Sequence, residues 1–120
     1  MMRKISQAAV NLWGIEAQML MVGEEASELD KAVHKWWRAW KKYNEKGISL
    51  TRSEDEIENL EDKAHQRYLE KTIKDVKTEA MQVFFLIDQL QVMLPGDYES
   101  ILEDVLKDAT NLLRQRGVEI

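Results

Sequence analysis

Residues 15–40, IEAQMLMVGEEASELDKAVHKWWRAW, place apolar or aromatic side chains at alternating intervals of four and three residues. Because an α-helix has about 3.6 residues per turn, these intervals bring the side chains to one face of a helix. The side chains on this face are Ile15, Met19, Val22, Ala26, Leu29, Val33, Trp36 and Trp40. We therefore expect one long helix with a buried stripe, which begins near Ile15 and ends between Lys42 and Gly47.

A second stretch with the same spacing lies at residues 69–94, LEKTIKDVKTEAMQVFFLIDQLQVML. Its apolar face consists of Leu69, Ile73, Val76, Ala80, Val83, Ile87, Leu90 and Leu94. Ser53 followed by Glu56 has the spacing of a capping box, so we expect this helix to begin at Ser53 and to end before Pro95. A longer apolar interval ahead of the stretch predicts a bend near His65–Tyr68.

Two shorter helices are expected on either side of the long ones. The first covers Arg3–Leu12 and stops near Gly14, and the last is capped by Asp97 and ends near Gly117. The last helix is expected to turn six side chains inward: Ile101, Val105, Leu106, Ala109, Leu112 and Leu113. The sequence thus predicts an all-α fold, with residues 1–120 forming one domain. We expect a helical bundle of about four helices with two long central helices.

The composition excludes several classes of protein. Cysteine is absent, which rules out a disulfide, a thiolate zinc site and a thiol nucleophile. This fits a reducing compartment, and we expect a cytoplasmic protein. The longest apolar run, Val83 to Ile87, is far too short for a membrane span. The net charge of −5 disfavours a general nucleic-acid binder, so neither a membrane nor a nucleic acid is an expected partner.

Two groups of oxygen-bearing side chains flank the apolar stripes. Glu25 and Glu28 lie on the first long helix, and Asp75, Glu79 and Gln82 lie on the second. Residues three, four or seven positions apart share a helix face, so the two groups could face each other if the helices pack antiparallel. Carboxylates held close together repel one another, and a divalent cation such as Mg²⁺ would relieve the repulsion.

Ordinary ion pairs are the alternative explanation of these acids. Glu25 could pair with Lys31, and Asp75 or Glu79 could pair with Lys71 or Lys74. On spacing alone ion pairs are the commoner explanation, because two glutamates three residues apart occur by chance in acidic helices.

The two acidic segments resemble a known enzyme family. Residues 13–18, WGIEAQ, and 23–29, GEEASEL, are similar to the opening of MazG-like nucleoside triphosphate pyrophosphohydrolases, members of the all-α NTP pyrophosphatase superfamily. Residues 78–90, TEAMQVFFLIDQL, resemble that family's second motif helix. The family pattern is ExxE on one helix and ExxD on the next. The resemblance covers about residues 11–94 with a gap in the middle.

The resemblance implies a set of metal ligands that are also the catalytic acids. These are Glu25, Glu28 and Glu79, with Glu24 and Asp75 as further candidate ligands. Gln82 stands where the family has Asp, and its amide oxygen would bind a metal weakly or through water. The chain also departs from the family in length, because fifty residues separate Glu28 from Glu79.

The implied activity is hydrolysis of a nucleoside triphosphate to the monophosphate and pyrophosphate. The resemblance implies Mg²⁺ as the cofactor, with Mn²⁺ as a substitute, and water attack on the α-phosphorus. It also implies a homodimer or homotetramer. Two alternatives stay open: a nucleotide- or metal-binding member that has lost activity through Gln82, and a structural helical assembly protein.

Further residues are candidate contacts to the substrate. Lys31, Lys35 and Arg38 form a cationic stripe that could hold phosphates, although a solvated helix face is the commoner explanation of such a stripe. Trp13 and Gln18 match positions near the family's nucleotide pocket, with helix packing as the alternative.

Overall fold

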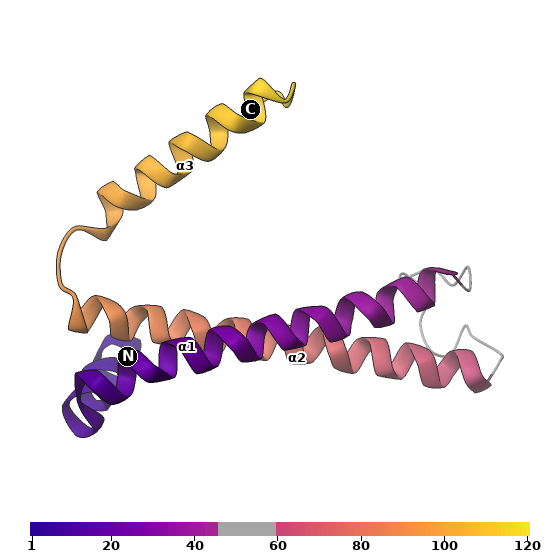
Figure 1. Ribbon diagram of the computed structural model, residues 1–120, viewed down its shortest axis with the longest axis horizontal. Coiled ribbons are helices and arrows are strands. Elements are labelled where there is room, and N and C mark those ends of the chain that lie inside the picture. Colours follow the sequence, from indigo (N-terminus) through magenta and orange to yellow (C-terminus); the bar gives the residue numbers. More distant parts are fainter. Residues whose placement is uncertain (46–59) are drawn as a thin grey trace.

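The computed structural model describes residues 1–45 and 60–120, and these residues form three helices: α1 (Met2–Glu45), α2 (Leu60–Met93) and α3 (Tyr98–Gln115). The two long helices, α1 and α2, form an antiparallel hairpin, and α3 rises away from one end of it (Figure 1). The all-α class and the two long central helices are confirmed. The described chain has three helices rather than four, because the first two expected helices run together in α1. The capping box at Ser53 and Glu56 lies outside the described residues.

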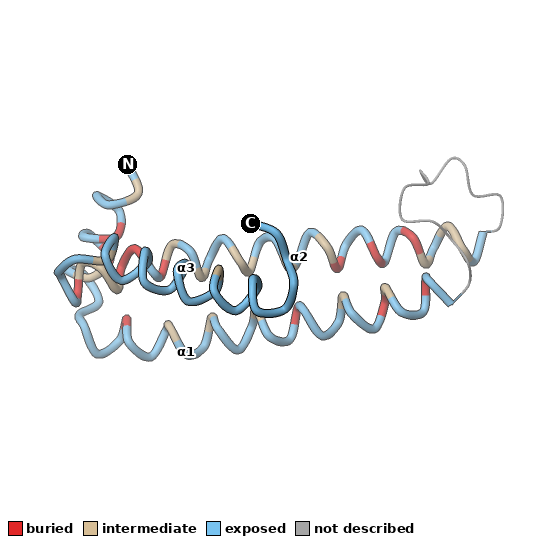
Figure 2. The backbone as a smooth tube through the Cα atoms, turned by 90° about the horizontal axis from the view of Figure 1, so that it is seen from above, coloured by how far each residue is buried: buried red, intermediate tan, exposed pale blue. Residues whose placement is uncertain are grey.

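The hairpin buries its residues along the line where α1 and α2 face each other (Figure 2). Its apolar core lies toward one end and consists of Ala39, Tyr43 and Leu69, with Trp36, Trp40 and Ile73 packed against them. The Tyr43 ring meets the His65 ring edge-on, with 5.6 Å between the ring centres.

The buried face of α1 is turned by one residue from the predicted face, so this prediction is partly wrong. Val22, Leu29 and Trp36 are partly buried as expected, but Ile15, Met19, Ala26 and Val33 are exposed. The inward positions are taken by Gln18, Glu25, Ala32 and Ala39, each one residue earlier than an expected position. The apolar stripe is wider than one neighbouring helix can cover, and packing selects the edge with the smaller side chains.

The same shift occurs on α2 only toward its C-terminal end. Leu69 is buried as expected, and the middle of the expected stripe is partly buried, but Ile87 and Leu94 are exposed. Leu86 and Met93, each one residue earlier, are buried in their place. The expected bend near His65–Tyr68 is also wrong, because α2 is continuous over this segment.

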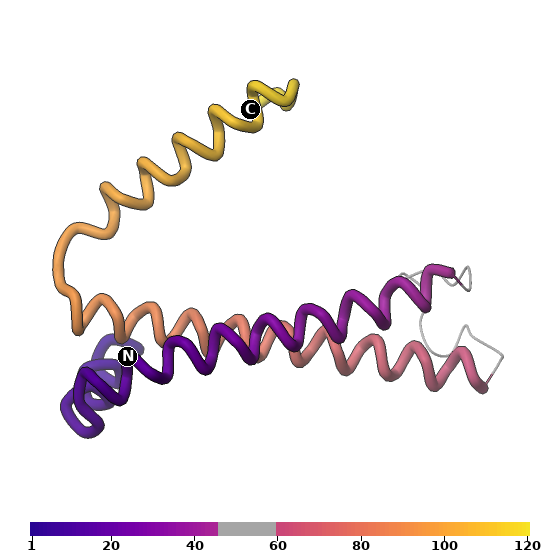
Figure 3. The backbone as a smooth tube through the Cα atoms, viewed as in Figure 1, coloured from indigo at the N-terminus to yellow at the C-terminus, as the bar shows by residue number. Residues whose placement is uncertain are grey.

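A kink at Gly14 divides α1 and turns its first residues away from the hairpin axis (Figure 3). Gly14 has φ 85° and ψ 163°, a combination that residues with a Cβ atom rarely adopt. The helix stop expected at this glycine is therefore present as a kink within α1.

An ion pair holds the N-terminal segment of α1 on α2. Arg3 donates from Nη2 to Asp88 Oδ1 at 2.7 Å, and Ser6 Oγ donates to Asp88 Oδ2 at 2.5 Å. The hydrogen bonds from Arg3 and Ser6 hold the pKa of the buried Asp88 carboxyl below its usual value. These contacts fix the direction in which the chain leaves Gly14.

The last helix does not pack on the hairpin as expected. Asp97 caps α3 by accepting a hydrogen bond from the Ser100 amide at 3.0 Å. None of the residues of α3 is buried, so its six expected inward side chains are exposed. In the part of the chain that the structure describes, no helix combines the length and apolar character needed to cross a membrane.

Candidate functional site

Glu25 of α1 and Glu79 of α2 come together near the middle of the hairpin, next to Gln82. The terminal amide group of Gln82 lies between the two carboxylates, 3.1 Å from Glu25 Oε2 and 2.9 Å from Glu79 Oε2. With its nitrogen turned toward them, the amide donates a hydrogen bond to each. The antiparallel packing thus brings one acid from each predicted group into a single cluster.

The ionised form of Glu79 is disfavoured in this cluster. Desolvation raises the pKa of Glu79 above its usual value, and the charges of Glu25 and Glu28, a hydrogen bond with Glu25 and the charge of Asp75 add to the shift. A carboxyl held in this way is relieved by a proton, by hydrogen-bond donors or by a cation. The amide of Gln82 provides the donors.

The expected set of metal ligands is only partly assembled. In the chain as described, residues 1–45 and 60–120, no three His, Cys, Asp or Glu side chains are grouped so that they could hold a metal ion. Glu28 pairs with Lys31 at 3.8 Å between Oε1 and Nζ, and both side chains are exposed. Glu24 and Asp75 line cavities on either side of the cluster and lie outside the Glu25–Glu79–Gln82 contact.

Glu25, Glu79 and Gln82 nevertheless fit a hard divalent cation by their donor chemistry. If the amide turns over, its oxygen takes the place of its nitrogen at the same short distances from both carboxylates. Neighbouring ligands in an octahedral Mg²⁺ site, with metal–oxygen distances of about 2.1 Å, are about 3 Å apart. Two carboxylates and one amide would leave the remaining positions to water or phosphate oxygens.

A polar cavity of about 380 Å³ lies on one side of the acidic cluster. It is lined by acids and cations together: Glu28, Asp75 and Glu79 with Lys31, Lys35 and Arg38. The buried Thr72 hydroxyl also lines it and donates to the Leu69 carbonyl oxygen at 2.7 Å. Cations beside a carboxylate cluster suit a ligand that carries phosphate groups, since phosphate oxygens accept hydrogen bonds from Arg and Lys.

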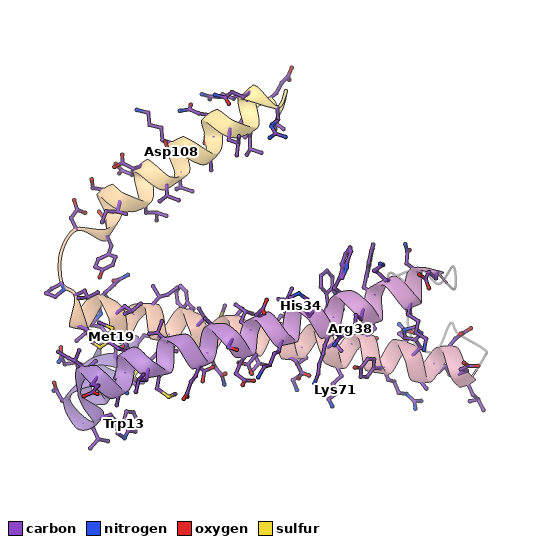
Figure 4. All side chains as sticks on the ribbon, viewed as in Figure 1. Trp13, Met19, His34, Arg38, Lys71 and Asp108 are labelled. Atoms are coloured by element: carbon purple, nitrogen blue, oxygen red, sulfur yellow. The ribbon has the colours of Figure 1, made fainter. Side chains whose placement is uncertain are left out.

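An apolar cavity of about 540 Å³ lies on the other side of the cluster. Its apolar wall includes Trp13, Met21 and Phe85, and its edge includes Glu25 and Gln82. Figure 4 shows Trp13 on the side of the hairpin that faces away from α3. Aromatic walls of this kind suit a flat, ring-shaped ligand.

Two buried amides line the apolar cavity. The side chains of Gln18 and Gln89 are 4% and 2% exposed, and Gln89 Oε1 has no hydrogen-bond partner among the described residues. A buried amide oxygen without a donor is unfavourable by about 1–3 kcal/mol. A ligand with an N–H group would satisfy Gln89.

The structure therefore places the predicted site residues in two adjoining cavities. Lys31, Lys35 and Arg38 lie in the polar cavity, and Trp13 and Gln18 lie in the apolar one. The sequence analysis missed three other lining residues, Thr72, Phe85 and Gln89. Their positions relative to Glu79 and Gln82, at intervals of three or seven residues, could have identified them as sharing one helix face.

Comparisons with known proteins add no further information about the site. No family model, curated protein or solved structure matches the chain. The chemistry of the site is therefore interpreted from its own residues.

Proposed function

We propose that this protein hydrolyses a nucleoside triphosphate to the monophosphate and pyrophosphate, with Mg²⁺ held by Glu25, Glu79 and Gln82. One observation carries the proposal: the acidic cluster lies between a cationic cavity and an aromatic cavity. A nucleoside triphosphate has the matching three parts, which are a metal-bound phosphate, a further anionic chain and a flat base. The resemblance of residues 13–29 and 78–90 to MazG-like pyrophosphohydrolases supports the same activity.

The cationic cavity would hold the part of the triphosphate that leaves. Lys31, Lys35 and Arg38 line it within reach of Glu28 and Glu79. Their N–H groups would donate to the β- and γ-phosphate oxygens and stabilise the charge that develops on pyrophosphate.

The aromatic cavity would bind the base. Trp13 and Phe85 offer ring faces, and Gln18 and Gln89 offer amide groups that can hydrogen-bond to the edge of a heterocycle. An amide both donates and accepts, so the pair can read the hydrogen-bonding pattern of a base.

A carboxylate beside the metal would accept the proton of the attacking water. A bound Mg²⁺ neutralises phosphate charge and lowers the pKa of a coordinated water. As the water oxygen bonds to the α-phosphorus, its proton passes to a carboxylate of the cluster, and the bridging oxygen leaves with pyrophosphate.

The test is pyrophosphate release from a panel of ribo- and deoxyribonucleoside triphosphates with Mg²⁺ or Mn²⁺. We expect Glu79→Gln to lower the rate at least about 100-fold, because removal of one charged group from such a site has effects of this size. Glu103→Gln removes an exposed acid of α3 and is the matched control, with an unchanged rate. Metal-independent release, or full activity of Glu79→Gln, would contradict the proposal.

A nucleotide-binding protein without hydrolytic activity is the second candidate. It is favoured by the side-chain nitrogen of Gln82, which donates hydrogen bonds to Glu25 and Glu79. This nitrogen lies where the two carboxylates would hold a metal. Calorimetric titration with Mg²⁺ and a non-hydrolysable nucleotide would then show binding in a protein that releases no pyrophosphate. In that case we expect Gln82→Asp to gain activity, since it restores a third charged ligand.

A further inference from the structure

Another cavity lies further along the hairpin than the polar cavity, next to the apolar core. It has a volume of about 190 Å³ and is formed by α1 and α2 together. From α1 it is lined by Lys35, Arg38 and Lys42, and from α2 by His65 and Tyr68. Lys35 and Arg38 also line the polar cavity, so the two spaces adjoin. We call this space the third cavity.

The third cavity differs from the polar cavity in its charge. The polar cavity has carboxylates beside its cations, whereas none of the described side chains that line the third cavity is acidic. Lys35, Arg38 and Lys42 form no ion pair with any residue in 1–45 or 60–120. Cations gathered in a recess without counter-charges repel one another, and a bound anion would relieve that repulsion.

The α2 wall of the third cavity rests on the apolar core. His65 Nε2 donates to the Ala39 carbonyl oxygen at 3.1 Å, and the His65 ring packs edge-on against Tyr43. Behind this wall Tyr43 and Leu69 are 1% and 2% exposed. A wall that is already ordered loses little conformational entropy when a ligand binds to it.

The donors of the third cavity suit a phosphate group. The guanidinium of Arg38 presents N–H groups in a plane that matches two oxygens of a phosphate, and each lysine presents up to three N–H groups. The Tyr68 hydroxyl has no hydrogen-bond partner among the described residues, so it can donate as well. Three positive charges match an anion with several negative charges better than they match a single carboxylate.

Charge and volume together favour a compact ligand. Acids lie at both ends of this cationic stretch. Asp75 lies in the polar cavity, and Glu45 and Glu61 lie about one turn beyond Lys42 and His65. An extended polyanion such as a nucleic-acid strand would meet these acids, whereas a small anion would not.

The third cavity is too far from the acidic cluster to hold the same phosphate chain. Lys42 lies 17 residues from Glu25 on α1, which corresponds to about 25 Å of helix. The three linked phosphates of one nucleotide are shorter than this distance, even with the length of a lysine side chain added. An anion beside Lys42 is therefore separate from a phosphate beside Glu25.

We propose that the third cavity is a binding site for a compact phosphate-type oxyanion, held by Lys42, Arg38 and Tyr68. The site needs no metal, and no residue of the Glu25–Glu79–Gln82 cluster lines it, so it does not rest on the proposed function. Under the proposed function, pyrophosphate that leaves the polar cavity would meet this site next, because Lys35 and Arg38 belong to both cavities.

Calorimetric titration of the full chain with inorganic pyrophosphate tests the site, in buffer without divalent metal and at constant ionic strength. We expect saturable binding of pyrophosphate to the wild type. Lys42→Gln should weaken this binding at least about 10-fold, which is the effect of losing a charged hydrogen bond. Lys41→Gln removes the same charge from the neighbouring position, which does not line the cavity, and is the matched control with unchanged binding.

Two further variants locate the anion. Tyr68→Phe removes only a hydroxyl group and should weaken binding by a smaller factor than Lys42→Gln does. Lys31 lines the polar cavity and not the third cavity, so Lys31→Gln should leave the binding unchanged. Circular dichroism checks that each variant keeps its helices.

A second titration with phenyl phosphate distinguishes two sources of the phosphate group. Tighter binding of pyrophosphate would indicate a free inorganic anion, and tighter binding of phenyl phosphate would indicate a phosphorylated organic molecule. In both cases Lys42→Gln should weaken the tighter ligand, which supports the proposal.

Three results would overturn the proposal. The first is no saturable binding of either probe. The second is equal weakening by Lys42→Gln and Lys41→Gln, which would indicate surface charge alone. The third is weakening by Lys31→Gln without weakening by Lys42→Gln, which would place the anion in the polar cavity. Because the titrations contain neither metal nor nucleotide, their failure would leave the proposed function standing, and absence of hydrolysis would leave the anion site standing.

Discussion

Two regions of the α1–α2 interface differ in what they bury. At one end Ala39, Tyr43 and Leu69 are 1–5% exposed and pack against tryptophan side chains. Around Glu25 and Glu79 the inward positions carry carboxylates and amides, and the surface opens into two cavities. A hairpin that buries apolar groups at one end can tolerate crowded carboxylates near its middle. Stability and the candidate chemistry are thus assigned to different parts of the same pair of helices.

The largest effect is expected from breaking the apolar end. Leu69→Ala removes a side chain that is 2% exposed, and we expect it to lower the free energy of unfolding by about 3 kcal/mol. Leu60→Ala removes the same atoms from a side chain that is 80% exposed and should cost less than about 0.5 kcal/mol. Denaturant unfolding monitored by circular dichroism measures both variants. Equal effects of the two substitutions would refute the assignment of stability to the core.

A smaller effect is expected at the ion pair that fixes the N-terminal segment. Asp88→Asn should lower the free energy of unfolding by about 2 kcal/mol at neutral pH, because it weakens charged hydrogen bonds from Arg3 and Ser6. The folded-state pKa of Asp88 is depressed. Its stabilisation is therefore fully present above the ordinary carboxyl pKa of about 4 and is lost as the pH falls through the folded value.

Unfolding curves at neutral and acidic pH check this dependence. The difference between the wild type and Asp88→Asn should shrink as the pH falls below about 4. A difference that stays constant down to the lowest pH would contradict the depressed pKa.

The smallest effect is expected at Glu79, where a substitution should stabilise the fold instead of destabilising it. The raised pKa of Glu79 means that its ionised form destabilises the fold above the folded-state pKa, and that this cost disappears as the pH falls below the ordinary glutamate value. Glu79→Gln should therefore raise the midpoint of thermal unfolding at neutral pH. Excess Mg²⁺ should raise the midpoint of the wild type and leave that of Glu79→Gln unchanged. A lower midpoint for Glu79→Gln without metal would contradict the crowding of the acids.

The sequence alone predicts the long helices well, because alternating intervals of four and three residues have few other solutions. It predicts less well which side of α1 and of α2 is buried. The apolar stripe of each helix is wide enough to offer two edges, and the periodicity does not show that Ala32 and Ala39 make one edge the tighter fit. The exposure of α3 could not be predicted either, because an amphipathic pattern gives the apolar side of a helix and not whether the rest of the chain covers it.

The candidate site is also predicted in part, since the sequence indicates which acids approach each other but not which of them make contact. The spacing predicts that Glu25 and Glu79 approach each other, and the structure brings them to the same amide. Glu28 and Asp75 share the helix faces of these acids but line the polar cavity, because each lies further around its helix from the α1–α2 interface. Periodicity gives the direction of a side chain to within about one helical position, whereas ligand contact requires finer placement.

The kink at Gly14 has a consequence for the apolar cavity. Trp13, which forms part of that cavity's wall, is the residue immediately before the kink. With any other residue at position 14, the backbone would favour a straight α1, which would carry Trp13 away from Phe85 and Arg3 away from Asp88. The torsion angles of Gly14 are available at low energy only to a residue without a side chain. They thus determine whether the hairpin has a cavity closed by Trp13 or an open surface.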